Sequence, residues 1–312
     1  MVVPVPRVRR RVAAALLATV LCGVLGGEAL GASATAAGDR FHAEVRYGRV
    51  AGTRIAYYER GQGPPLLMLI GTGSTMAEWD PALIRLLAAH HRLVMFDYPG
   101  VGFSGPWRGR TSFDSLANFT AGLMKTVGLA RADVLGWSMG GFVAQRLAID
   151  HPGRVSRLVL AGTNPGGRQT VLGSRHFQEI DSEPHPSEAQ ILHELYPPHA
   201  QRQGHAFLRR LEVASQSGEI PNDFHVAAAT TDRQVAAEDP WLRSEDNWDS
   251  LAEIAAPTLA TAGARDPVVP PLNLRRIARR VPGARFQRFA GAHAFLFQSR
   301  ARFTRAVDAF LR

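Results

Sequence analysis

The chain has 312 residues, of which 46% are hydrophobic and 20% are charged, with 30 glycines and 20 prolines. This length fits one or two domains and the apolar fraction allows a sizeable core, so collagen-like, disulfide-rich and wholly disordered proteins are excluded. The formal net charge is +9, and arginine supplies almost all of the positive charge because Lys125 is the only lysine. Cys22 is the only cysteine, which excludes an intramolecular disulfide and a cysteine-based metal site.

The N-terminus has the pattern of an export signal. Four arginines precede an apolar run over residues 12–25, and a segment of small residues follows at 31–37. The small-x-small pattern in this segment predicts cleavage near Ala36 and a secreted or cell-envelope protein. The apolar run is short for a membrane span and is interrupted at residues 26–28, so we expect no stable membrane insertion after cleavage. An uncleaved N-terminal anchor is the alternative, and the adjacent arginines leave both Sec and twin-arginine export open.

Beyond this signal, apolar runs alternate with segments of helical spacing. Residues 41–50 and 55–59 predict two antiparallel strands around a turn. Buried strands are expected at residues 66–70, 93–96, 134–137, 158–161, 258–262 and 286–289. Helices are expected at residues 81–90, 113–127, 142–149 and 274–281. Strands that alternate with helices predict an α/β protein with a mostly parallel sheet covered on both faces.

The alternation breaks between residues 163 and 247. This segment is rich in histidine, proline and charged residues, and it has helix-like pieces at residues 188–195 and 206–215. We therefore expect a helical excursion inserted between two strands. Its aromatic residues are expected to fill the core of the excursion, and some of them to wall a substrate pocket. They are Phe177, Tyr196, Phe207, Phe224, Trp241 and Trp248.

The sharpest motif is GWSMG at residues 136–140. It matches G-x-S-x-G, in which a serine lies on a tight turn between a buried strand and a helix. Such a turn needs neighbours without bulk, which Gly136 and Gly140 supply. The turn is expected to project the Ser138 hydroxyl at the N-terminus of the helix, where free N–H groups favour developing negative charge. A nucleotide-binding loop is the alternative, but the pattern G-x-G-x-x-G is absent here.

With this motif the chain resembles the α/β-hydrolase superfamily, in particular its Ser-His-Asp esterase-like members. Residues 96–104, FDYPGVGFS, resemble the segment that follows the fourth strand in this family. The order of the strands and the position of the insert also resemble the family's sheet and cap. The resemblance covers nearly the whole chain after the export signal. With the signal peptide at 1–36, it implies an α/β-hydrolase core at 37–163 and 250–312 and a helical cap insert at 164–249.

A serine nucleophile needs a base, and the base needs a carboxylate that orients it. Of the 11 histidines, only His293 lies in a loop of small residues directly after the last expected strand. Asp266 directly follows the expected strand at 258–262, and the order Ser, Asp, His is that of this fold. We therefore predict a triad of Ser138, Asp266 and His293. The other histidines lie at helix ends or at irregular spacings, and neither a metal nor a cofactor is expected.

Acyl transfer also needs two hydrogen-bond donors for the carbonyl oxygen that becomes charged. The backbone N–H of Met139, directly after the nucleophile, is one expected donor. The second is expected from the loop at residues 71–75, at the backbone N–H of Thr72. Where the family usually has His-Gly, this chain has Ile70 and Gly71. Since the donor is a backbone group, this departure affects the packing of the loop rather than the donor itself.

These residues favour a secreted serine hydrolase that cleaves a carboxylic ester or similar small acyl substrate through an acyl-enzyme on Ser138. The same triad serves carbon–carbon hydrolases, lactonases, aminopeptidases and cofactor-free haloperoxidases or perhydrolases, so these chemistries stay open. Haloalkane dehalogenases and epoxide hydrolases are disfavoured because they have aspartate in place of this serine. A second class is a non-catalytic binding protein on a hydrolase scaffold, although such proteins usually lack a triad residue.

The basic charge raises a third possibility, a protein that docks on an anionic cell envelope or on nucleic acid. The arginines are dispersed along the chain, apart from the pairs at 275–276 and 279–280 on one expected helix. We interpret them as a solvated surface and expect no nucleic-acid partner.

Overall fold

The computed structural model describes residues 42–180 and 187–312, so the predicted export signal lies outside the described residues. Eight strands form one sheet in the order β1-β2-β4-β3-β5-β6-β7-β8. The strands are β1 Arg46–Val50, β2 Thr53–Arg60, β3 Pro65–Leu69, β4 Arg92–Phe96, β5 Ala132–Trp137, β6 Val155–Ala161, β7 Thr258–Gly263 and β8 Arg285–Phe289. Strand β2 pairs with β1 and β4 in antiparallel fashion, and all other pairs are parallel. The predicted mostly parallel sheet is therefore confirmed.

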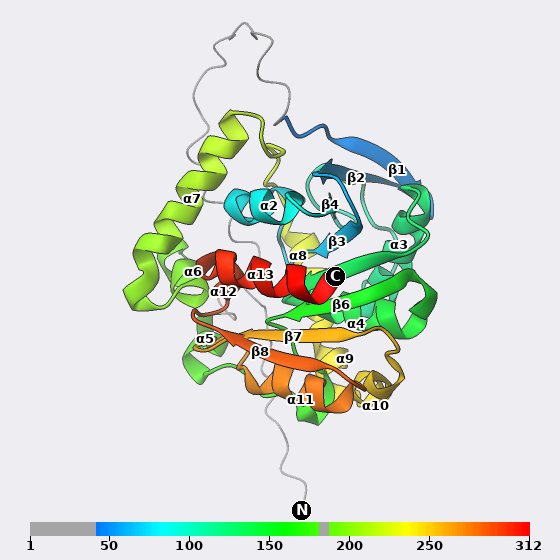
Figure 1. Ribbon diagram of the computed structural model, residues 1–312, viewed down its shortest axis with the longest axis vertical. Coiled ribbons are helices and arrows are strands. Elements are labelled where there is room, and N and C mark those ends of the chain that lie inside the picture. The colour runs from blue at the N-terminus through cyan, green and yellow to red at the C-terminus, as the bar shows by residue number, and fades with distance from the viewer. Residues whose placement is uncertain (1–41, 181–186) are drawn as a thin grey trace, which may run out of the picture.

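Helices lie on both faces of this sheet (Figure 1). The helices outside the insert are α2 Pro81–Ala88, α3 Phe113–Thr126, α4 Met139–Asp150, α11 Leu272–Arg280, α12 Phe295–Gln298 and α13 Arg300–Leu311. Helices α2 and α13 pack together in front of the sheet in Figure 1, and α3 and α4 pack together behind it. Within the described residues, no helix has both the length and the apolar composition needed to cross a membrane.

Between β6 and β7 the chain forms the expected helical excursion, which we call the insert. Its helices are α5 Arg175–Ile180, α6 Glu188–Leu195, α7 Gln201–Gln216, α8 Ala228–Ala236, α9 Glu238–Arg243 and α10 Asp246–Ser250. The insert also shortens the first expected strand, which begins at Arg46. The backbone N–H of Ala43 donates to the carbonyl of Gly218 in the insert, at 2.7 Å, instead of joining the sheet.

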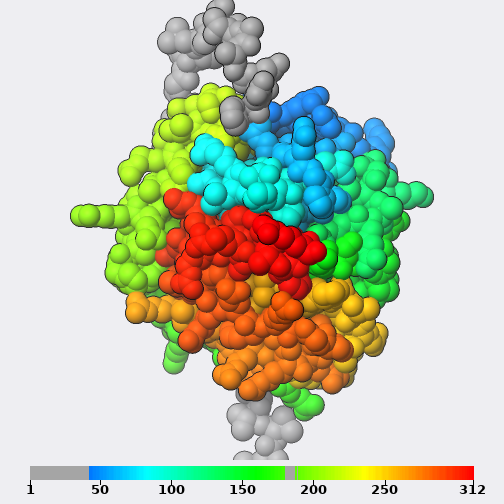
Figure 2. Space-filling view, in the orientation of Figure 1, coloured from blue at the N-terminus to red at the C-terminus, as the bar shows by residue number. Residues whose placement is uncertain are grey.

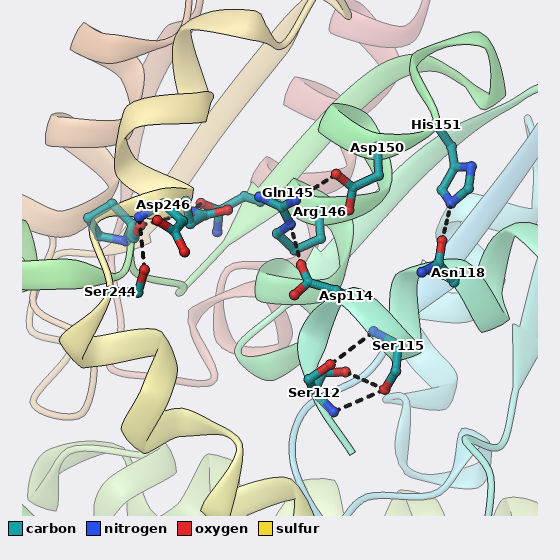
Figure 3. Close-up of polar contacts among 12 residues, drawn as sticks. Ser112, Asp114, Ser115, Asn118, Gln145, Arg146, Asp150, His151, Ser244 and Asp246 are labelled. Atoms are coloured by element: carbon teal, nitrogen blue, oxygen red, sulfur yellow. Dashed lines mark hydrogen bonds and ion pairs between the residues drawn. The ribbon is translucent and has the colours of Figure 1, made fainter. Parts of the chain in front are cut away.

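Local capping explains where helices α2 and α3 begin. Helix α3 follows Ser112, and the side chains of Ser112 and Ser115 each accept a hydrogen bond from the other's backbone N–H, at 3.1 and 3.0 Å (Figure 3). Asp80 caps α2 by accepting from the N–H of Ala82, and Pro81 occupies the first helical position. Helix α2 ends before His91, which the sequence pattern suggested as a polar helix end. His91 is instead buried and lies 3.0 Å from the Asp308 carboxylate of α13.

Helix α4, which carries the predicted nucleophile at its N-terminus, is fastened to α3 by polar contacts. Arg146 of α4 forms ion pairs with Asp114 of α3, at 2.6 Å, and with Asp150 of its own helix, at 2.5 Å (Figure 3). Nearby, His151 lies 2.7 Å from the side-chain oxygen of Asn118. These contacts join the exposed sides of two helices whose apolar sides lie on the sheet.

The insert is joined to the core by one buried ion pair and by aromatic packing. Arg210 of α7 donates two hydrogen bonds to the fully buried carboxylate of Asp80, at 2.9 and 2.7 Å. On the same helix, Phe207 stacks on Phe297 of α12, with ring centroids 5.2 Å apart. At the other end of the insert, Trp241 of α9 packs against Phe142 of α4. The insert and the core therefore share a continuous packed interior.

The buried ion pair gives a test of how the insert is held. Replacement of Arg210 with methionine leaves the Asp80 carboxylate buried without its partner, so we expect Arg210→Met to lower the free energy of unfolding by about 3 kcal/mol. The matched control is Arg209→Met, because Arg209 is the exposed neighbour on the same helix, and it should change stability by less than about 0.5 kcal/mol. Urea unfolding measures both variants. Equal losses in the two would contradict this assignment.

Candidate active site

Ser138 lies on a strained turn between β5 and α4. Its backbone has φ of 56° and ψ of −123°, a conformation that costs a non-glycine residue on the order of 1–3 kcal/mol. The turn fits only because its flanking glycines lack side chains. A Cβ at Gly140 would overlap the carbonyl oxygen of Leu69, and a Cβ at Gly136 would overlap that of Gly140. Ser138 is partly exposed, whereas both of its chain neighbours are buried.

The structure brings the predicted acid and base together. Asp266 follows β7, and its Oδ2 lies 2.9 Å from Nδ1 of His293, which follows β8. The other carboxylate oxygen, Oδ1, accepts hydrogen bonds from the backbone N–H groups of Val268 and Val269, at 3.0 and 2.9 Å. Asp266 is 4% exposed and His293 is 5% exposed. Because a carboxylate only accepts, Nδ1 carries a proton, which in the neutral imidazole leaves Nε2 with a free lone pair.

His293 is held next to the nucleophile turn through Trp137, the residue before Ser138. The indole N–H of Trp137 donates to the carbonyl of His293 at 3.1 Å, and the two rings are 5.5 Å apart. On its other side the imidazole of His293 packs closely against Gly162, where an added Cβ would lie 3.3 Å from Cε1 of the ring. Ser138 Oγ makes no hydrogen bond to any described residue, His293 included. The hydroxyl is therefore available to a substrate, and such contacts often tighten only when substrate binds.

The predicted oxyanion loop runs beside Ser138. A Cβ at Gly71 would lie 3.3 Å from the Cβ of Ser138 and 3.7 Å from its Oγ. Thr72 and Met139 are both buried, with 8% and 0% exposure. Among the described residues, neither of their backbone N–H groups donates a hydrogen bond to another protein atom. A buried N–H without a partner costs about 1–3 kcal/mol, so two such groups beside one partly exposed hydroxyl are typical of a site for a substrate oxygen.

Neighbouring residues hold the loop so that these N–H groups stay free. The N–H of Gly73 donates to the side-chain oxygen of Gln234 in α8, at 2.7 Å. The N–H of Thr75 donates to Glu78 at 2.5 Å, and that of Met76 donates to Asp97 at 2.7 Å. At Thr72 itself, the hydroxyl lies 3.5 Å from the carboxyl group of Glu238 in α9. The loop is thus positioned from the core and from the insert together.

Sequence reasoning missed these positioning residues. Asp97 lies in the FDYPGVGFS segment, which could have indicated it. Glu78 could have been found from the sequence, because Thr75 and Glu78 have the S/T-x-x-E spacing of a capping box. Gln234 and Glu238 have no local signal, because their partners lie in other parts of the fold. Buried amide side chains also join α4 to the insert. The side-chain oxygen of Gln145 in α4 accepts a hydrogen bond from the side-chain N–H of Asn247 in α10, at 3.0 Å.

The aromatic residues of the insert serve mainly as its core. Five of the six are buried, namely Phe177, Tyr196, Phe207, Phe224 and Trp241. The sixth, Trp248, packs partly buried against the core and lies under the guanidinium of Arg280. Among the described residues, no three His, Cys, Asp or Glu side chains are grouped so that they could hold a metal ion.

Burial changes the acidity of the two carboxyl groups that hold the loop. Removal from water raises the pKa of Glu78 to about 8 and that of Asp97 to about 7, although backbone N–H donors partly counteract this effect. At neutral pH the Glu78 side chain is therefore mainly protonated.

This pKa predicts a pH-dependent stability. The folded protein keeps a proton on Glu78 up to about pH 8, whereas the unfolded chain releases it near the ordinary value of 4.5, so stability falls as pH rises between these values. Glu78→Gln should remove this contribution, about 1.4 kcal/mol per pH unit within the window. The free energy of unfolding in urea at several pH values measures it. The exposed Glu253 provides the control, Glu253→Gln, and a Glu78→Gln curve parallel to the wild-type curve would contradict the prediction.

Comparison with known proteins agrees with this geometry. A family model for the alpha/beta hydrolase fold matches residues 64–300. A poly(3-hydroxyalkanoate) depolymerase of Ectopseudomonas oleovorans is 31% identical over 246 residues, which cover 74% of this chain and 78% of that protein. The 2-hydroxy-6-oxononadienedioate/2-hydroxy-6-oxononatrienedioate hydrolase 2 of Pseudomonas putida is 32% identical over 247 residues, which cover 75% of this chain and 82% of that protein.

Among solved structures, an alpha/beta hydrolase fold protein from Chitinophaga pinensis superimposes with a TM-score of 0.77 and 24% identity, covering 88% of this chain and 98% of that one. The extent of the family match, the depolymerase similarity and the shared fold lead to one conclusion: this chain belongs to the α/β-hydrolase family.

Proposed function

We propose that the protein is a serine hydrolase that cleaves a carboxylic ester or a similar small acyl substrate through an acyl-enzyme on Ser138. The observation that carries this proposal is the pair of free backbone N–H groups, on Thr72 and Met139, beside the partly exposed Ser138 hydroxyl. The contact of His293 with Asp266 supplies a base whose Nε2 is free to accept a proton. Together these groups provide a nucleophile, a base and a site for negative charge.

The proposed reaction uses these groups in turn. As Ser138 Oγ bonds to the substrate carbonyl carbon, its proton passes to Nε2 of His293, and Asp266 stabilises the resulting imidazolium. The carbonyl oxygen becomes negative and accepts hydrogen bonds from Thr72 and Met139. The bond to the alcohol then breaks, the alcohol takes the proton from His293, and an acyl-enzyme is left. Water, deprotonated by His293, attacks the acyl carbon and releases the acid and the free Ser138 hydroxyl.

The insert, residues 164–249, is proposed to act as a cap over this site. Two contacts support a cap: Gln234 accepts from Gly73 in the oxyanion loop, and the carbonyl of Leu195 accepts from the N–H of Ala294, next to His293, at 3.0 Å. We also propose that the protein is exported to the cell envelope or the medium and that its signal is cleaved near Ala36, on the sequence pattern of residues 1–36.

Replacement of the nucleophile tests the proposed reaction. Ser138→Ala should lower kcat for p-nitrophenyl esters by about 10⁴-fold or more, because no other hydroxyl can form the acyl-enzyme. The control is Ser217→Ala, since Ser217 is exposed at the end of α7, and it should keep wild-type turnover. A panel of esters of graded chain length, with one lactone and one peptide arylamide, defines the acyl class. If Ser138→Ala retains more than about a hundredth of the ester turnover, the assignment is wrong.

A further inference from the structure

The net positive charge of the chain comes from residues 272–312. Residues 272–312 contain ten arginines and a single acidic residue, Asp308. Residues 1–271 contain 26 basic and 26 acidic residues, so the C-terminal segment carries the whole formal net charge of +9. Although the arginines look dispersed when the whole sequence is scanned, their excess over acidic residues comes from one segment.

This segment forms one side of the folded protein. It comprises α11, β8, α12 and α13, at the edge of the sheet that ends in β8. The surfaces of α11 and β8 (orange) and of α13 (red) adjoin on the face that Figure 2 presents. Eight of the ten arginines are exposed: Arg275, Arg279, Arg280, Arg285, Arg288, Arg302, Arg305 and Arg312.

The described residues supply no carboxylate partner for these side chains. None of the ten arginines forms an ion pair with a carboxylate of the described residues. Asp308 is 7% exposed and is engaged by His91. Arg276, Arg280 and Arg300 donate only to backbone carbonyl groups. Concentrated like charge opposes folding, so its presence here is better explained by a partner than by stability.

A groove within this side combines charge with an apolar floor. It lies between α13 and the first residues of β7 and β8, with a volume of about 540 Å³. Arg285, Arg302 and Arg305 line it together with the partly buried rings of Phe286 and Phe310. We call it the arginine groove. Guanidinium groups pair well with phosphate, and the apolar floor fits the start of an acyl chain, whereas a polyanion without apolar parts would leave the floor unused.

The position of the groove leaves the candidate active site accessible. The groove contacts β7 at Leu259 and β8 at Arg285, near the beginnings of these strands. Asp266 and His293 follow the ends of the same two strands, and Ser138 follows the end of β5. A partner bound at the groove therefore lies near the N-terminal ends of these strands, whereas the proposed reaction takes place at their C-terminal ends.

We propose that the protein docks, without insertion, on the surface of a bilayer rich in anionic phospholipid, and that the arginine groove is the centre of the contact. Lipid phosphates would pair with the groove arginines, and the exposed arginines of α11 and β8 would add long-range attraction.

Vesicle co-sedimentation of the full purified chain tests this proposal. Binding is expected to vesicles of equal parts phosphatidylglycerol and phosphatidylcholine, to weaken as sodium chloride is raised, and to be absent with phosphatidylcholine alone. The triple variant Arg285→Glu, Arg302→Glu and Arg305→Glu should lower the partition coefficient roughly 100-fold or more.

The matched control reverses three exposed arginines elsewhere: Arg108→Glu, Arg202→Glu and Arg209→Glu. It has the same net charge as the groove variant but should bind vesicles at least about ten-fold more tightly, because electrostatic attraction falls off within a Debye length. Thermal unfolding checks that both variants are folded. Equal loss of binding in the two variants would overturn the groove assignment. Retention on immobilised heparin without binding to anionic vesicles would overturn the choice of lipid.

Discussion

The backbone of β3 and the first turn of α4 touch at Gly140, and the rest of the candidate site depends on this contact. No side chain fits between Gly140 and the Leu69 carbonyl group. With glycine there, the turn holds Ser138 at a positive φ and keeps its hydroxyl partly exposed. The strain is offset by local bonds, including that from the Ser138 N–H to the carbonyl of Ala161, at 3.0 Å. The same close approach brings the loop after β3 beside the hydroxyl.

The backbone N–H of Thr72 makes no hydrogen bond within the described residues, whereas three of the N–H groups that follow it in the loop are bound to side chains. The loop after β3 is fixed through Gly73, Thr75 and Met76, whose N–H groups reach side chains of α8, of the 3₁₀ turn at residues 76–78, and of the segment after β4. The loop is therefore held in one conformation before substrate binds, as its proposed role as a donor to a developing negative charge requires. Because one of these supports is Gln234, the insert takes part in positioning this loop.

Much of the fold could be predicted because strong signals are local. Buried strands appear as apolar runs, and the tight turn at Ser138 appears as a glycine pattern within five residues. The contacts of Gln234 and of His91 could not be predicted, since each partner comes from a distant segment and no local pattern encodes the pairing. Helix α13 was not expected, although its buried residues recur at helical spacing. The arginines were interpreted as dispersed because arginine is frequent along the whole chain. The net charge of residues 272–312 appears only when acidic residues are counted as well, and the fold then places α11, β8 and α13 side by side.

The most direct test of the central claim is to trap the intermediate. The protein is mixed with a p-nitrophenyl ester, quenched in acid during steady turnover, digested, and analysed by peptide mass spectrometry. The account predicts an added acyl mass on the peptide that contains Ser138, at a level that falls as the ester is consumed. Two results, each with continued ester turnover, would contradict it. One is an acyl mass on a residue other than Ser138, and the other is no acylated peptide with an ester whose acylation step is faster than its deacylation step.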